Sequence, residues 1–320
     1  MTHATDGVVS VQHLSKTFGT VQAVDDLTFE VGPGRVTGFL GPNGAGKTTT
    51  LRMLLGLVVP TSGTTTIGGR MYHDLGTPGR VVGAALEASS FHPGRSARDH
   101  LRVLAPQVGV PTTRCDEVLE LVGLADAARR RTGGFSLGMR QRLGLASTLL
   151  GDPKVLLLDE PANGLDPEGI AWLRSLLRYL AGQGRTVLVS SHVLSEVQQT
   201  VDDVVIIAKG RLVHASSLPE LEALARREGL ARRTTLLASP DAAALARLVE
   251  DRWPGRATSV PDRPGAVLLQ DVDAAEAGGA AFAAGVEVHE LVPGEVNLED
   301  VFLRLTGGNT GAPTAGEVAA

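Results

Sequence analysis

The stretch Gly41-Pro-Asn-Gly-Ala-Gly46-Lys47-Thr48 decides the fold of this 320-residue chain. It fits the pattern G-x-x-x-x-G-K-[S/T], in which glycines let the backbone wrap around a phosphate group. Backbone N–H groups and a helix N-terminus supply the positive potential at such a loop. An apolar run, Arg35–Leu40, precedes the stretch, and a helical pattern from Lys47 to Leu57 follows it. The motif in this strand–loop–helix context predicts a nucleotide-binding site.

Two residues of the loop carry specific chemistry in this prediction. Lys47 is expected to reach the outer phosphates, and the Thr48 hydroxyl is expected to face Mg²⁺. The residues predicted to contact the nucleotide phosphates are Gly41, Pro42, Asn43, Gly44, Ala45, Gly46, Lys47, Thr48 and Thr49.

A second apolar run, Val155–Asp159, ends in two adjacent acids, Asp159 and Glu160. A buried strand has no structural need for two carboxylates at its tip. If that tip faces the phosphates, Asp159 holds Mg²⁺, through water in the usual arrangement, and Glu160 polarises the attacking water. The alternative is a strand-end turn whose two acids are solvated.

Two further motifs are ambiguous when only the residues are considered. His192 follows the apolar strand Thr186–Ser190, where it is either a γ-phosphate contact or a structural histidine. The stretch Phe135–Arg142 contains a Ser/Gly turn that opens a helix. Such a turn is either a second anion site or, as the residues alone favour, an N-capped helix.

Composition and charge restrict the class of protein. The chain is 43% hydrophobic and 20% charged, and its 39 Gly and 17 Pro stay below the share typical of low-complexity chains, so we expect a folded globular protein. Its length of 320 residues predicts about two domains. A net charge of −5 disfavours a non-specific nucleic-acid binder. A single cysteine, Cys115, excludes an internal disulfide and a cysteine-cluster metal site. Neither a membrane span nor a signal peptide is expected, so the sequence predicts a cytoplasmic protein.

The order of predicted elements is that of an α/β protein with a smaller C-terminal α+β domain. Short strands alternate with helices over residues 1–215, with antiparallel edge strands at Val8–Leu14 and Leu27–Val31 and a helical lobe at about 88–150. A linker helix is expected at 216–232. Residues 233–306 show the order βαββαβ, a ferredoxin-like pattern, and 307–320 are expected to be a disordered tail.

Taken together, these motifs resemble the ATP-binding cassette of ABC transporters over nearly all of residues 8–215. The resemblance implies a P-loop NTPase fold with a mixed sheet, and binding and hydrolysis of ATP with Mg²⁺. Each matching position takes its expected role from the family. By this resemblance the glycine loop is the phosphate loop, and Val155–Pro161 is the second acidic motif. The D-loop is Asn163–Asp166, with Asp166 at its end, and the switch histidine is His192. Phe18 is expected to stack on adenine, and the signature is expected to include Ser136, Gly138 and Met139.

Two departures from the usual motifs of the family restrict the resemblance to one group of its members. The usual signature LSGGQ is replaced by Phe135-Ser-Leu-Gly-Met139, and Glu87 stands where the family has a glutamine that contacts the metal or the water. A carboxylate at that position adds negative charge beside the phosphates. Both departures, and the C-terminal stretch Leu298–Gly307, are similar to those of bacterial drug and antibiotic export ATPases of the bacitracin and daunorubicin type.

The resemblance also implies partners. Two copies would close head to tail around two ATP molecules, and a separate membrane permease would contact the segment near Glu87 and the region at about 88–130, at the cytoplasmic face of the membrane. No nucleic-acid partner is expected. The alternatives are a soluble ABC ATPase that acts on ribosomes or DNA, or a regulatory module of low turnover. The transported substrate, the direction of transport and the role of the C-terminal domain do not follow from the sequence.

Overall fold

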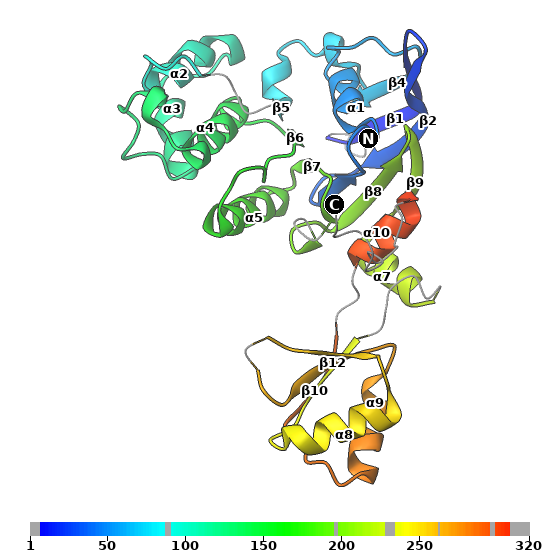
Figure 1. Cartoon of the computed structure of the whole chain (residues 1–320). Coiled ribbons are helices and arrows are strands. Elements are labelled where there is room, and N and C mark those ends of the chain that lie inside the picture. Colours follow the sequence, from blue (N-terminus) through cyan, green and yellow to red (C-terminus); the bar gives the residue numbers. More distant parts are fainter. Residues whose placement is uncertain are drawn as a thin grey trace, which may run out of the picture. The chain divides into compact units, whose positions relative to one another are not determined.

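A computed structural model describes residues 7–86, 91–194, 198–227, 234–261, 263–294 and 298–307 of the chain. The chain divides into two compact units, Met1–Leu218 and Pro219–Ala320 (Figure 1). Glu87, which the sequence places in the glutamine position of the family, lies outside the described residues.

The first unit is built on a six-stranded sheet with the strand order β5-β6-β7-β3-β8-β9. The first five strands are parallel, and β9 pairs antiparallel with β8. Strands β3, β6 and β7 are buried along nearly their whole length, as expected for parallel strands that are covered on both faces. The strands are β3 (Val36–Leu40), β5 (Val82–Ala85), β6 (Val155–Asp159), β7 (Thr186–Ser191), β8 (Asp203–Ala208) and β9 (Arg211–Ser217).

A three-stranded antiparallel sheet packs over this central sheet. Its order is β2-β1-β4, with β1 at Val9–Phe18, β2 at Val21–Val31 and β4 at Ser62–Ile67. One apolar core joins residues of both sheets with α1 (Lys47–Leu54). Within it the rings of Phe29 and Phe39 lie 5.2 Å apart. The core therefore fixes the glycine loop, which leads from β3 into α1, between the two sheets.

The remaining helices of this unit are α2 (Ala97–Leu104), α3 (Thr113–Leu121), α4 (Leu137–Leu149) and α5 (Pro167–Gly182). Figure 1 shows α2, α3 and α4 gathered in a helical lobe. Arg142 of α4 stacks on Trp172 of α5, with its guanidinium 4.1 Å from the ring centroid, and donates to the Val122 carbonyl at 3.3 Å. These contacts tie the lobe to α5. Short 3₁₀ turns lie at Tyr72–Asp74, Pro78–Arg80, Ala105–Val108 and Thr132–Gly134.

The second unit holds an antiparallel sheet with the order β11-β12-β10-β13. Its own apolar core includes Leu237, Leu245 and Leu269, and the Trp253 indole donates to Glu276 at 2.9 Å. The elements are α7 (Leu218–Arg227), β10 (Thr234–Ala238), α8 (Ala242–Arg252), β11 (Ala257–Ser259), β12 (Ala266–Gln270), α9 (Ala274–Ala283), β13 (Glu290–Pro293) and α10 (Leu298–Thr306).

The fold class is confirmed, but several element predictions need correction. Strands β4 and β9 were not expected, because neither shows clear apolar alternation: β4 is rich in threonine, and β9 is largely exposed. The expected edge strands are longer and form a sheet of their own. Helix α1 ends at Leu54 rather than Leu57, because the chain turns at Gly56, whose φ is +66°.

Candidate functional site

The glycine loop is held between a strand of the central sheet and a strand of the smaller sheet. A Cβ atom on Gly41 would lie 2.5 Å from the carbonyl oxygen of Ile207 in β8. A Cβ atom on Gly46, whose φ is +105°, would lie 2.6 Å from the carbonyl oxygen of Ala23 in β2. Only glycine satisfies both the left-handed backbone and these close approaches. The two sheets therefore constrain the shape of the loop.

Lys47 is buried at the start of α1, and its ammonium lies inside the loop. The Nζ atom donates to the carbonyl oxygens of Gly41 at 2.6 Å and Pro42 at 3.4 Å. It also lies 3.5 Å from Oε1 of Glu160. Burial lowers the pKa of the Lys47 ammonium, and the nearby Glu160 carboxylate acts in the opposite direction. The ammonium is thus a partly desolvated cation enclosed by carbonyl oxygens, at the place where outer phosphates are expected.

The two acids at the tip of β6 contact this loop and the tip of β7. Asp159 accepts a hydrogen bond from the Thr48 hydroxyl at 2.7 Å, and its other oxygen accepts from the Ser190 hydroxyl. Glu160 lies 2.9 Å from Nδ1 of His192, and its backbone N–H donates to the Ser190 hydroxyl at 3.0 Å. The structure thus brings together residues that lie far apart in the sequence, at the carboxyl ends of adjacent parallel strands.

Two features of this cluster did not follow from the sequence. Ser190 links both acids, because Asp159 and Ser190 are paired across β6 and β7. Glu160 has a left-handed backbone, with φ of +49°. This conformation costs free energy for a non-glycine residue and persists where the surrounding structure enforces it, as it often does at functional sites. The sequence feature that could have indicated the link between the two acids is the serine, Ser190, near the end of the neighbouring strand β7.

The signature segment, Phe135–Met139, lies at the start of α4 and contacts the D-loop of the same chain. Ser136 caps the helix and accepts from the Met139 N–H at 3.3 Å. Leu137 packs on Gly164, where a Cβ atom would lie 2.2 Å from the Leu137 side chain. The Gln141 amide donates to the Asn163 carbonyl at 3.2 Å. The signature segment and the D-loop are therefore joined on one surface.

Two other predicted residues lie at helix and strand ends. Asp166 caps α5 and accepts from the Gly169 N–H at 2.8 Å. Phe18 ends β1, and 49% of its surface is exposed. Its ring lies 4.9 Å from the Lys16 ammonium. Phe18 is thus a solvent-accessible aromatic ring on the sheet that also contacts the phosphate loop.

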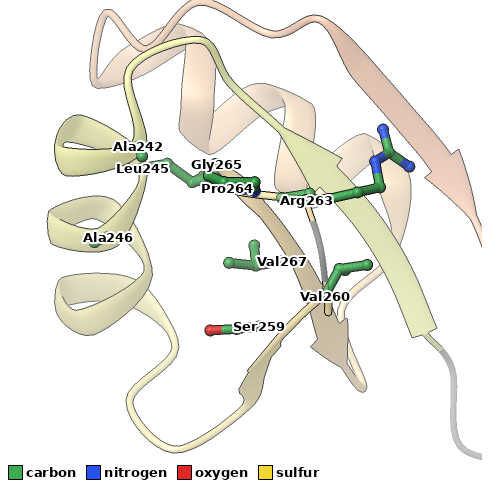
Figure 2. A pocket seen from close by; sticks show the side chains of 10 residues that line it. Ala242, Leu245, Ala246, Ser259, Val260, Arg263, Pro264, Gly265 and Val267 are labelled. Atoms are coloured by element: carbon green, nitrogen blue, oxygen red, sulfur yellow. The ribbon is translucent and has the colours of Figure 1, made fainter.

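A separate cavity of about 400 Å³ lies in the second unit, between α8 and the β11–β12 hairpin. Figure 2 shows Leu245 and Val267 pointing into it, while the Arg263 guanidinium points away. That guanidinium pairs with Glu290. Among the described lining residues the cavity therefore gathers no set of polar groups comparable with the cluster around Glu160.

Two kinds of feature are absent from the parts of the chain that the structure describes. Within them, no three or more His, Cys, Asp or Glu side chains come together as a metal site. None of the helices described combines the length and apolarity needed to cross a membrane.

The fold and this cluster define a P-loop nucleotide-binding protein. The sequence profile of the family described as "ABC transporter" matches residues 24–163. A bacitracin transport ATP-binding protein from Enterococcus faecalis is 34% identical over 94% of this chain and 97% of its own length. Its namesake from Bacillus licheniformis is 45% identical over 64% of this chain and 68% of its own length. The chain belongs to the ABC transporter ATP-binding family, and it is an ATP-binding ATPase subunit.

Solved structures agree with this assignment. The structure of an ATP-binding subunit of an ABC transporter has a TM-score of 0.62 and 27% identity, and it covers 69% of this chain and 93% of that chain. A dimeric ATP-binding cassette in a post-hydrolysis state has a TM-score of 0.59 at 21% identity, a likeness that shows the fold.

Proposed function

We propose that this chain hydrolyses Mg²⁺–ATP as a homodimer and thereby drives a separate membrane permease that exports a drug, an antibiotic or a similar small amphipathic compound. The cluster that joins Thr48, Asp159, Glu160 and His192 carries the proposal, because it places an acid–base pair beside a preformed phosphate loop. The export class rests on relatives whose names state bacitracin and lantibiotic transport.

In this proposal the loop residues 41–49 hold the ATP phosphates, and Lys47 neutralises the outer ones. The Lys47 ammonium donates to the carbonyl oxygens of Gly41 and Pro42, which hold it inside the loop. A phosphate oxygen of ATP would take the place of one of these carbonyls as acceptor. A charge-assisted hydrogen bond of this kind is stronger than a neutral one.

The Thr48 hydroxyl and, through water, the Asp159 carboxylate are proposed to hold Mg²⁺. A hydroxyl and a carboxylate oxygen 2.7 Å apart suit a small hard cation, which takes its other ligands from phosphate and water. Mg²⁺ held by these residues would supply positive charge that stabilises the phosphates. The Ser190 hydroxyl holds the second Asp159 oxygen, so the carboxylate presents a fixed edge.

Glu160 is the proposed general base, and His192 orients it. The Glu160 carboxylate would accept the proton of the attacking water, and it lies 3.5 Å from the Lys47 ammonium of the phosphate loop. His192 contacts Glu160 through Nδ1, so Nε2 is the ring atom to face a γ-phosphate oxygen. Glu87 is proposed to adjust the metal or the permease contact.

The proposed homodimer is supported by the exposed start of α4 at Ser136 and Leu137. Ser136, Gly138 and Met139 begin α4, whose first N–H groups form a positive helix end. We propose that this end binds the γ-phosphate held by a second copy, with Asp166 and the rest of the D-loop beside it. Phe18 is the proposed adenine-stacking residue.

The proposed domains are a cassette over 1–215, a linker helix at 216–232 and an accessory domain over 233–306. The boundary between compact units at Leu218 and Pro219 supports this division. The relative from Enterococcus faecalis matches over nearly the whole chain, which supports an accessory domain common to both proteins.

The proposal is tested by purifying the chain together with a candidate permease and placing both in vesicles. We expect ATP hydrolysis that rises when the membrane protein is present, and uptake of a peptide antibiotic into inside-out vesicles. Glu160→Gln in the same vesicles should abolish both. Stimulation by ribosomes or DNA in place of the membrane protein would support the soluble alternative, and ATP binding without turnover would support a regulatory module.

A further inference from the structure

Lys16 has no part in the proposed function. It lies two positions before Phe18 on β1, so the two side chains share a face of the strand. The Lys16 ammonium is 4.9 Å from the centroid of the Phe18 ring, within the range of a cation–π contact. The Phe18 ring, which is proposed to stack on adenine, therefore makes a cation–π contact with the Lys16 ammonium.

A second contact fixes the position of that cation. The Lys16 ammonium donates to the backbone carbonyl oxygen of Val59 at 2.7 Å. The loop that carries Val59 is itself bound to β1, because the Thr17 N–H donates to the Thr61 hydroxyl at 3.0 Å and the Thr61 N–H donates to the Ser15 carbonyl at 2.8 Å. The ammonium is thus held between a fixed carbonyl and the Phe18 ring.

The phosphate loop contacts β2, which pairs with β1 on the side opposite to β4. Strand β1 is the middle strand of its sheet, with β4 on one side and β2 on the other. Val59 belongs to the segment that leads into β4, whereas Gly46 of the phosphate loop lies against Ala23 of β2. The cation is therefore anchored from the β4 side, while a nucleotide on the phosphate loop would reach Phe18 from the β2 side.

We propose that Lys16 is a positioning residue for the nucleotide base: its ammonium covers one face of the Phe18 ring and keeps the opposite face available for adenine. This inference rests on the proposed role of Phe18. A half-exposed ring at the end of a strand would otherwise be free to rotate, and the contact holds it in one orientation. The cation also attracts the π electrons of the ring, which lowers the electrostatic repulsion between the ring and a stacked purine.

The experiment measures the affinity of the full chain for ADP and for inorganic tripolyphosphate, which lacks a base, by calorimetry in one buffer. We expect Lys16→Met, which keeps the aliphatic stem, to weaken ADP binding about two- to five-fold and to leave tripolyphosphate binding unchanged. Lys16→Arg should restore ADP affinity, because a guanidinium also stacks on an aromatic face. The matched control is Lys154→Met at the amino end of β6, which should change neither affinity.

A double mutant identifies the route of the effect. If Lys16 acts through the ring, Lys16→Met added to Phe18→Ala should weaken ADP binding no further than Phe18→Ala alone. An equal loss of affinity for tripolyphosphate, or a full Lys16 effect in the Phe18→Ala background, would overturn the proposal. So would unchanged ADP binding in Lys16→Met when Phe18→Ala weakens it. If Phe18→Ala itself leaves ADP affinity unchanged, the proposed adenine site fails, and the role of Lys16 fails with it.

Discussion

The phosphate loop and the signature segment differ in how much of their environment one chain supplies. The phosphate loop is enclosed by two sheets, its lysine is buried, and the acids beside it are held by Thr48, Ser190 and His192. The signature segment is exposed at Leu137, which packs on Gly164 of the D-loop, while Ser136 caps its own helix. One region is organised by folding alone, whereas the other presents an open helix end.

This difference predicts how the two regions respond to mutation. Changes in the phosphate loop or beside it should alter nucleotide binding, hydrolysis or stability of an isolated chain. Changes in the signature segment should leave nucleotide binding by the isolated chain unaltered, should cost no more stability than the loss of a helix cap, about 1 kcal/mol, and should weaken the association of two copies. Substitutions in the two regions test that contrast, and the expected change in rate, affinity or stability is largest at Glu160 and smallest at Ser136.

The largest expected effect is that of Glu160→Gln on turnover. The amide cannot accept the proton of the attacking water, so the rate of hydrolysis should fall about 10²- to 10⁴-fold, the typical contribution of a general base. ATP should still bind and should trap a dimer, because the phosphate loop is unchanged. Phosphate release measures the rate, and size-exclusion chromatography with ATP measures the dimer.

Glu120→Gln is the matched control, because Glu120 is an exposed glutamate on α3. It should hydrolyse ATP at the original rate. Normal turnover by the Glu160 variant would remove Glu160 from the proposed role and would leave the acids at the tip of β6 as structural groups.

Lys47→Ala should cause the next largest effect, a loss of nucleotide affinity. The ammonium makes charge-assisted hydrogen bonds, and losing one such interaction corresponds to about a 10- to 100-fold weaker dissociation constant. Titration calorimetry with ADP on the isolated chain measures it, with Lys154→Ala as the control. An unchanged affinity would contradict the assignment of the phosphate loop.

The sequence predicted Glu160 and Lys47 as site residues because each belongs to a short motif whose chemistry is local. The glycine loop and the acidic strand end can be identified within a few residues, and the structure places Thr48 and Asp159 in contact although 110 residues separate them along the chain. Ser190 could not be assigned in the same way. Its contact with Asp159 depends on the register between β6 and β7, which the sequence does not state.

The weaker parts of the prediction have a common cause. Strands β4 and β9 are stabilised by pairing with neighbours rather than by an apolar pattern of their own. The contact of Leu137 with Gly164 and that of Lys16 with Val59 join segments that only the folded chain brings together. Contacts that depend on tertiary structure are thus the ones that sequence patterns missed.

Gly46→Ala tests whether folding alone shapes the phosphate loop. The new methyl group would meet the Ala23 carbonyl, and alanine would have to adopt a φ of +105°. We expect the free energy of unfolding to fall by about 1–3 kcal/mol in the absence of nucleotide, measured by urea titration.

Gly182→Ala is the matched control for this substitution. Gly182 ends α5, and nothing lies within 4 Å of a Cβ atom placed there. This variant should be unchanged or more stable by about 0.4–1 kcal/mol. If Gly46→Ala were equally stable, the loop would be shaped by the ligand rather than by the two sheets.

The smallest effect is expected at Ser136, and it separates a capping role from a binding role. Alanine at this position removes the N-cap of α4, at a cost of about 1 kcal/mol, whereas aspartate preserves the cap. If Ser136 only caps the helix, Ser136→Asp should behave like the original chain. If the helix end faces a phosphate held by a second copy, the added carboxylate should repel it. Ser136→Asp should then weaken the ATP-dependent dimer of the Glu160→Gln chain more than Ser136→Ala does, with ADP affinity unchanged in both.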